Sequence, residues 1–235
     1  MNKEKPIIFS GPMVRAVLEG RKTQTRRIIK PQPDLCGDGS IYYPDRSASR
    51  WKHYVSEGHF IRGVAVDFSP YGQPGTKLWV RETWQLFFDD EISPDRFRGP
   101  RGTMGIPAQP ERLSFAFYRA DGDLINPEFG KAHWMSPLYM PRKYSRITLE
   151  ITNVRVERVQ DISEEDARSE GAQKTKNGWS MEHPRPKDEC LSTARTAFAN
   201  YFCKLHGGKK WNLKPTNLWD VNPWVWVIEF KRLTP

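Results

Sequence analysis

The sequence has few cysteines and no long apolar run, and each absence excludes a class of protein. Its three cysteines among 235 residues are an odd, sparse set, which argues against a disulfide framework and favours reduced thiols in the cytoplasm. No apolar run is long enough to cross a bilayer, and the first residues lack the continuous apolar stretch of a signal peptide. We therefore expect a cytoplasmic protein with no membrane partner.

Hydrophobic residues are also scarce, at 37% of the chain, but aromatic residues are not. The sequence holds 9 Trp, 8 Tyr and 12 Phe, whereas disordered proteins are poor in aromatics. A length of 235 residues suits one large domain, or one domain with insertions. The composition therefore predicts a folded protein and excludes a disordered one.

Basic residues outnumber acidic ones, and the surplus gathers near the amino terminus. The formal net charge is +9, from 37 Lys and Arg against 28 Asp and Glu. Residues 1–30 hold eight basic and two acidic side chains, a net charge of +6. Such a surplus favours a polyanionic partner, mostly nucleic acid, although a soluble protein can also simply be basic.

The order of expected elements indicates an α+β fold. A short strand over 6–9 precedes a helix that begins after Ser10 and stops at Gly20. The later elements do not alternate strand and helix, so we expect a mixed or antiparallel sheet in a small barrel with flanking helices. Further strands are expected at 60–68, 77–84, 113–119, 145–159 and 223–233, with helices after Ser163 and at 188–206.

Two irregular stretches interrupt this pattern. Residues at about 31–60 and 86–140 lack a steady period and are rich in turn-forming residues. We therefore predict a single domain over 1–235 with insertions at these two places. The alternation within 145–159 changes phase near Asn153, which predicts a β-bulge.

Common catalytic and metal-binding motifs are missing. The sequence has no phosphate-cradling Gly-rich loop, no zinc-finger spacing and no nucleophile elbow. Cys190, Cys203 and His206 could together bind a metal, but helical cysteines usually pack in cores. We predict no metal and no cofactor.

The stretch from Gly20 to Arg27 carries the most chemical information. Cations bind phosphate and hydroxyls add hydrogen bonds, which favours nucleic-acid binding. The alternative is a solvated edge strand, where Lys and Arg discourage aggregation. The stretch contains four cations and two hydroxyls: Arg21, Lys22, Thr23, Thr25, Arg26 and Arg27.

The block LEGRKTQTRR at 18–27 resembles the signature of ASCH domains, the activating-signal-cointegrator homology group of the PUA-like superfamily. Residues 74–80 resemble the family's turn and strand, although Thr76 stands where Asp is usual. Residues 161–171 resemble its acidic helix, and 224–230 its last strand. The whole chain is most similar to the long ASCH-like proteins of phages and prophages, with matching blocks over less than half of its length.

This resemblance implies a small mixed β-barrel with a basic cleft for RNA, single-stranded nucleic acid or a modified nucleoside. Some small bacterial members are amidohydrolases that remove the acyl group of N4-acetylcytidine, and they need a Lys, a Thr and a Glu. These map onto Lys22 as general base, Thr25 as nucleophile and Glu170 as orienting acid. Other members are ribonucleases or simply bind, so the resemblance leaves the activity open.

The proposed catalytic residues must meet two physical conditions. Lys22 can act as a base only if burial or neighbouring cations lower its pKa. Lys22 and Thr25 would face opposite sides of a regular strand, so Lys22 must lie in the turn after Gly20 or the strand must be bulged. The alternative for Glu170 is a solvated helix residue.

Nucleic-acid contacts are predicted at basic side chains and at one aromatic side chain. Trp84 ends a strand before a Gly- and Pro-rich loop, which favours it as a residue that stacks on a base. Two alternatives to an enzyme remain: a non-enzymatic reader of RNA or DNA, and a phage accessory protein that binds another protein through its insertions. The oligomeric state stays open. The predicted nucleic-acid contacts are Arg21, Arg26, Arg27, Arg81 and Trp84.

Overall fold

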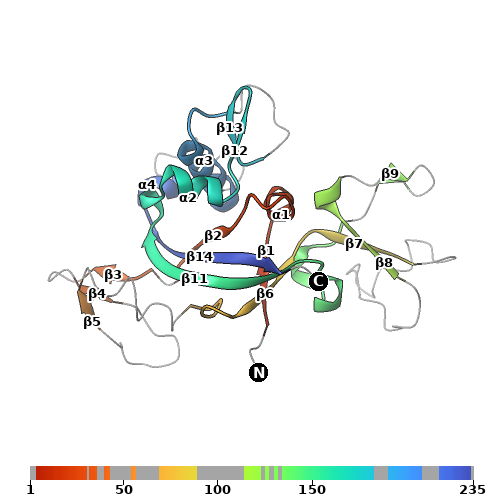
Figure 1. Cartoon of the computed structure of the whole chain (residues 1–235), viewed down its shortest axis with the longest axis horizontal. Coiled ribbons are helices and arrows are strands. Elements are labelled where there is room, and N and C mark those ends of the chain that lie inside the picture. Colours follow the sequence, from red (N-terminus) through yellow and green to blue (C-terminus); the bar gives the residue numbers. More distant parts are fainter. Residues whose placement is uncertain are drawn as a thin grey trace.

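A five-stranded mixed sheet forms the centre of the protein, as seen in a computed structural model (Figure 1). The structure describes residues 4–30, 32–35, 40–42, 54–56, 69–88, 114–122, 125–126, 130–131, 134–182, 190–207 and 217–233. In sheet order the strands are β1 (Lys5–Ile8), β6 (Lys77–Arg81), β11 (Thr148–Arg158), β14 (Trp224–Leu233) and β2 (Gln24–Ile28). Strands β1 and β6 are parallel, whereas the other neighbours are antiparallel, so the predicted mixed sheet is confirmed.

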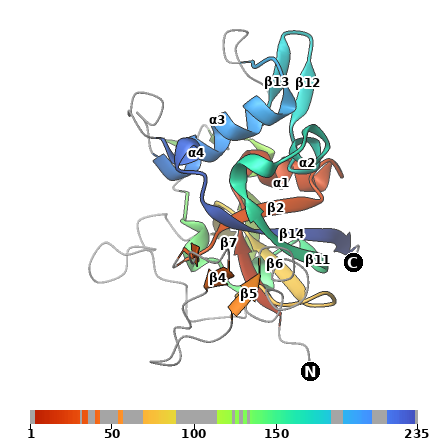
Figure 2. The same cartoon turned by 90° about the vertical axis from the view of Figure 1, so that its left-hand side faces the viewer.

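Helices accompany this sheet, which confirms the α+β class. Helices α2, α3 and α4 lie together beside β14 and β11, and Figure 2 shows α1 next to α2 on the same side of the sheet. Ser163 caps α2 as expected, by accepting a hydrogen bond from the backbone N–H of Asp166. The helices are α1 (Gly11–Leu18), α2 (Glu164–Ser169), α3 (Ala194–Gly207) and α4 (Leu218–Val221), with 3-10 turns η3 (Arg119–Asp121), η4 (Pro137–Tyr139), η5 (Arg142–Tyr144) and η6 (Val159–Asp161).

Smaller sheets of two or three strands complete the described part of the chain. Strand β7 (Trp84–Phe88), which runs into the predicted second insertion, pairs with β8 (Ser114–Tyr118) inside it, so the strand expected at 113–119 is confirmed and part of that insertion is regular. The strand expected over 77–84 is two strands, because β6 ends at Arg81. The strand expected at 60–68 lies outside the described residues. The remaining strands are β3 (Asp34–Leu35), β4 (Ser40–Tyr42), β5 (Tyr54–Ser56), β9 (Ile125–Asn126), β10 (Gly130–Lys131), β12 (Gln173–Thr175) and β13 (Gly178–Ser180).

The central strand β14 is covered on both faces. Its first five residues, 224–228, are all buried, which explains why this strand reads as a continuous apolar run. Its partner β11 shifts register between Ile151 and Asn153, so the predicted bulge is confirmed. Strand β11 pairs with β14 on both sides of the bulge and with β6 at its start.

Within the residues that the structure describes, the strand pairing does not close the five-stranded sheet into a barrel. Strands β1 and β2 are the two edges, and no backbone ladder joins them in the described part of the chain. One side-chain bond spans these edges, because Nη2 of Arg27 donates to the carbonyl oxygen of Ile8 at 2.6 Å. The closed barrel expected from the sequence is therefore not confirmed.

Two further expectations concern membranes and metals. Among the described residues, no helix is long and apolar enough to cross a membrane. The same residues contain no group of three His, Cys, Asp or Glu side chains placed to hold a metal. Cys203 packs in the core and lies 3.6 Å from Oδ1 of Asn217, while His206 packs on Phe202.

Candidate functional site

The turn after α1 places Lys22. The backbone N–H of Gly20 bonds to the carbonyl of Val17, and that of Arg21 to the carbonyl of Ala16, which is the Schellman pattern of a helix end. Gly20 has a φ of 74°, a conformation that glycine adopts without the usual steric cost. The N–H of Lys22 also bonds to Ala16, so Lys22 belongs to the turn and not to strand β2. This meets the geometric condition set by the sequence.

The ammonium group of Lys22 is buried among three acceptors. Its Nζ lies 2.6 Å from Oε2 of Glu170, 2.9 Å from the backbone oxygen of Glu170 and 2.7 Å from the backbone oxygen of Gln24. Three protons thus meet three acceptors, as the charged form requires. Burial lowers the pKa of Lys22, and the carboxylate of Glu170 opposes that shift.

Glu170 is buried, so the alternative of a solvated helix residue is wrong. It is the last residue before Gly171, whose φ of 109° turns the chain after α2. A Cβ at Gly171 would lie 3.0 Å from Cβ of Ala16 and 3.5 Å from Cβ of Lys22. The absence of a side chain at this position therefore lets α2 approach α1 closely enough for Lys22 to reach Glu170.

Arg26 belongs to a buried network of charges. Its Nη2 contacts Glu157 and lies 2.9 Å from Oδ2 of Asp166, and its Nη1 lies 3.3 Å from Oε1 of Glu170. Arg155 joins the same carboxylates of Glu157 and Asp166. The side chain of Arg26 is fully buried, so the structure does not leave it free to bind phosphate, contrary to our prediction.

Thr25 points to the other face of β2. Gln24 and Arg26 face α2, because Nε2 of Gln24 donates to the backbone oxygen of Asp166. Thr25 pairs across the sheet with Ile228, and directly opposed side chains share one face. Phe230 is on that face and packs against Phe9. Thr25 is 1% exposed, and its hydroxyl has no hydrogen-bond partner in the described structure.

The ring of Phe9 connects Thr25's face of the sheet with Lys22. Nζ of Lys22 lies 5.6 Å from the ring centroid, and the guanidinium carbon of Arg27 lies 5.4 Å from it. Next to Phe9, the hydroxyl of Ser10 hydrogen-bonds that of Tyr201 from α3. The sequence predicted Ser10 as the N-cap of α1, which is confirmed for its backbone, whereas its hydroxyl serves this contact instead.

The structure therefore brings Lys22 and Glu170 together and puts Thr25 one peptide away, since Lys22 bonds the carbonyl that precedes Thr25. Reasoning from sequence missed Phe9 and Tyr201, which belong to elements that read only as core strand and core helix. It also missed the pairing role of Asp166, which read as an acidic residue at a helix start.

The other predicted nucleic-acid contacts lie elsewhere. Arg21 bonds Glu19 and the backbone oxygen of Gly171. Arg81 stacks on Trp79, with 4.6 Å from its guanidinium carbon to the ring centroid. Trp84 is 0% exposed and stacks on Tyr144 in a separate core cluster, so it is not available to stack on a base, and we withdraw that prediction.

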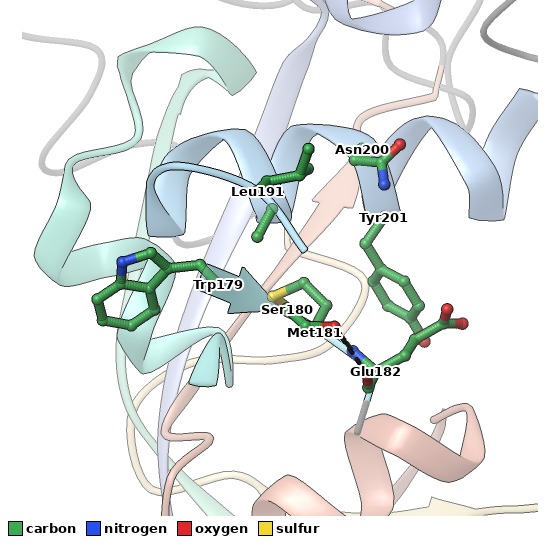
Figure 3. A pocket seen from close by; sticks show the side chains of 8 residues that line it. Trp179, Ser180, Met181, Glu182, Leu191, Asn200 and Tyr201 are labelled. Carbon is green, nitrogen blue, oxygen red and sulfur yellow. Dashed lines mark hydrogen bonds between the residues drawn. The ribbon is translucent and has the colours of Figure 1, made fainter. Parts of the chain in front are cut away.

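Two cavities are both lined by Ser180, the last residue of β13, and by Met181, which follows it. The smaller, of about 10 Å³, has room for about one water molecule. Tyr201 extends from α3 toward Glu182 along its wall (Figure 3). The larger, of about 310 Å³, lies between α1, η3 and the hairpin of β12 and β13.

Compared with protein-family models, with curated proteins and with solved structures, the chain matches none. The function must therefore be argued from the geometry of these residues.

Proposed function

We propose that the protein binds RNA, single-stranded nucleic acid or a modified nucleoside on the face of β2 that carries Thr25 and Arg27. The observation that supports this most is the buried, unpaired hydroxyl of Thr25. Leaving such a group unpaired costs about 1–3 kcal/mol, and a ligand that supplies a partner removes this cost. Arg27 adds positive charge beside it and Phe9 an aromatic ring, the two side-chain types that bind phosphates and bases.

The resemblance of residues 18–27 to ASCH domains supports the same site. In this proposal the fold is a PUA-like barrel in which the bond from Arg27 to Ile8 joins the two edge strands. A cytoplasmic protein of the phage or prophage type would meet its nucleic-acid ligand there. The buried network around Arg26 then serves to hold β2, and Arg27 is the cation that remains for the ligand.

Hydrolysis of the acyl amide of an N4-acylated cytidine is the second candidate, favoured by the contact of Lys22 with the Gln24–Thr25 peptide. Lys22 would first give the proton that it shares with Glu170 to that carboxylate, and Oγ1 of Thr25 would then add to the acyl carbon while its own proton passes to the Lys22 amine. The C–N bond then breaks, the cytidine amine leaves with that proton, and water hydrolyses the ester on Thr25. Burial lowers the pKa of Lys22, which supports this role, and Glu170 would orient the amine.

Thr25→Val tests both functions, because valine keeps the shape of threonine and removes the hydroxyl. Wild type and variant are titrated calorimetrically with N4-acetylcytidine, cytidine and a short single-stranded RNA, and products are measured by mass spectrometry. We expect the variant to lose binding by about tenfold or more. Product from wild type alone supports hydrolysis, and binding without product supports a reader. Equal binding by both proteins would contradict the proposal.

Lys22→Ala is a weaker test. It removes the partner of a buried carboxylate, so loss of activity would not separate catalysis from misfolding. Thr25→Val has no such effect, since the hydroxyl that it removes has no partner to leave unpaired.

A further inference from the structure

The larger cavity lies outside the group formed by Lys22, Thr25 and Glu170. It has a volume of about 310 Å³, at the lower end of the range of small-molecule sites. Helix α1 and the hairpin of β12 and β13, which supply most of its wall, lie on the same side of the sheet (Figure 1). Its lining includes Arg15, Glu19, Arg21, Ala120, Asp121, Gln173 and Met181.

The lining combines buried apolar groups with a polar rim. Ala120 and Met181 are buried, whereas Glu19 and Asp121 are exposed charged residues. An apolar surface with a few polar groups beside it suits a ring that is hydrophobic on its faces and polar at its edge.

The charges of the rim balance one another. Glu19 lies 2.5 Å from Nη2 of Arg21, and both carboxylate oxygens of Asp121 accept hydrogen bonds from Arg146. Arg15 donates to the backbone oxygen of Ala120. This balance does not favour a phosphate, which needs an excess of positive charge. It favours a neutral group with both donors and acceptors, as a nucleobase has.

Gln173 adds a group that can read such an edge. It is the first residue of β12, it is partly exposed, and its side-chain amide makes no hydrogen bond within the described structure. An amide offers one acceptor and two donors, which can pair with the polar edge of a base.

The cavity adjoins the buried pair of Lys22 and Glu170 through Arg21 and Gly171. Arg21 precedes Lys22 in the chain, and its Nη1 donates at 2.7 Å to the carbonyl of Gly171, which follows Glu170. Arg21 and Gly171 are thus the chain neighbours of Lys22 and Glu170, and a ligand in the cavity would lie close to that buried pair.

We infer that this cavity binds the nucleobase of one nucleoside unit of the ligand, with the amide of Gln173 as the group that discriminates between bases. The inference rests on the proposed function, because it names where one base of the proposed nucleic-acid or nucleoside ligand is bound. Because the rim carries no surplus charge, the cavity binds the base, and other side chains such as Arg27 make any phosphate contact.

Gln173→Trp in the full-length protein tests this inference by filling the cavity. Lys174→Trp is the matched control, since Lys174 is exposed and is the next residue of the same strand, with its side chain on the other face. Calorimetric titration with adenosine, guanosine, cytidine and uridine should show binding of at least one nucleoside by wild type. We expect about tenfold weaker binding by the Gln173 variant and unchanged binding by the Lys174 variant. Near-UV circular dichroism confirms that both variants are folded.

The outcomes separate this inference from the proposed function. Equal binding by Gln173→Trp and wild type overturns the inference, and if Thr25→Val then loses binding, the proposed function survives. Loss of binding in Gln173→Trp with none in Thr25→Val supports the cavity and contradicts the role of Thr25. Binding of no nucleoside by wild type overturns the inference, and the RNA titration then decides on the proposed function.

Discussion

Nζ of Lys22 lies 2.6 Å from Oε2 of Glu170, although 148 residues separate them in the sequence. The contact joins the turn after α1 to the end of α2, and neither side chain is exposed to solvent. Two desolvated charges are stable together only when their remaining donors and acceptors are also paired. Here two backbone carbonyls complete the shell of Lys22, and Arg26 contacts the second oxygen of Glu170. The pair thus holds two distant segments of the chain in one position.

Replacing either member of this pair should destabilise the protein. We expect Lys22→Met to reduce the free energy of unfolding by about 3 kcal/mol, because it leaves the carboxylate of Glu170 with only Arg26 as a charged partner. Glu170→Leu should cost a similar amount. The double variant should lose less than both single losses together, by about 1 kcal/mol or more. Urea unfolding of the four proteins measures this coupling, and additive losses would show that the two side chains do not depend on each other.

Neighbouring arginines in β2 should behave differently. Arg26→Ala removes one charged partner from each of three carboxylates and should lower the free energy of unfolding by about 3 kcal/mol or more. Arg27→Gln should preserve the fold and, if Arg27 contacts a phosphate, reduce the slope of log affinity against log salt by about 1. Fluorescence anisotropy with a labelled single-stranded RNA at several salt concentrations measures that slope. Lys143→Gln, at an exposed position in η5, is the control.

An unchanged slope in Arg27→Gln would contradict phosphate contact by Arg27. A slope that falls equally in the Lys143 variant would assign the effect to the general positive charge of the protein.

Gly20 and Gly171 shape the turns that place Lys22 and Glu170, and substitution by alanine should show that the two glycines have different roles. Gly20→Ala should cost about 1 kcal/mol, because its φ is 74° but an added Cβ meets nothing within 4 Å. Gly171→Ala should cost more, since its Cβ would also lie 3.0 Å from Cβ of Ala16. Thermal unfolding of both variants gives the comparison. Equal losses would mean that close approach of α1 and α2 is not needed at Gly171.

Much of the framework could be predicted from sequence, because it depends on local pattern. The stop at Gly20, the cap at Ser163 and the bulge near Asn153 each have a local signature, and the structure contains all three. The position of Lys22 in the turn was one of two arrangements that the geometric requirement left open, the other being a bulged strand. A role for Glu170 had no local signal and was implied only by the resemblance to ASCH domains, and its burial was not predicted.

What could not be predicted depends on long-range packing. Arg26 and Arg27 are adjacent and chemically identical, yet the strand sends Arg26 toward α2 and Arg27 toward Phe9. The sequence predicts Trp84 as the last residue of a strand before a Gly- and Pro-rich loop, but in the structure Trp84 begins β7, and Tyr144, 60 residues later in the chain, covers it. Whether a strand lies at the edge or in the centre of a sheet, and which of its faces is buried, depends on the segments that pack against it. Alternation of apolar and polar residues within the strand does not identify those segments.

Stability at acid pH should depend on Asp166. Burial alone would raise its pKa, but Arg26, Gln24 and Arg155 hold the pKa below the ordinary value of 3.8. The unfolded chain therefore binds more protons than the folded one between that value and the lowered pKa. The stabilisation from Asp166 is then complete above the ordinary value and is lost as the pH falls through the lowered pKa. The contribution of Glu82 to stability changes with pH in the opposite direction. Burial raises the pKa of Glu82, so its contribution to the free energy of unfolding declines as the pH rises past 4.5.

Urea unfolding of wild type and Asp166→Asn between pH 7 and pH 2.5 tests this assignment. The wild-type free energy of unfolding should fall as the pH drops below about 4, and the fall should be shallower in the variant, which has no proton to bind at this position. Some acid dependence should remain in the variant, since Glu4 and Glu164 also have lowered pKa values. Parallel curves for the two proteins would mean that Asp166 is not preferentially ionised in the folded state, and would remove the evidence that its contact with Arg26 stabilises β2.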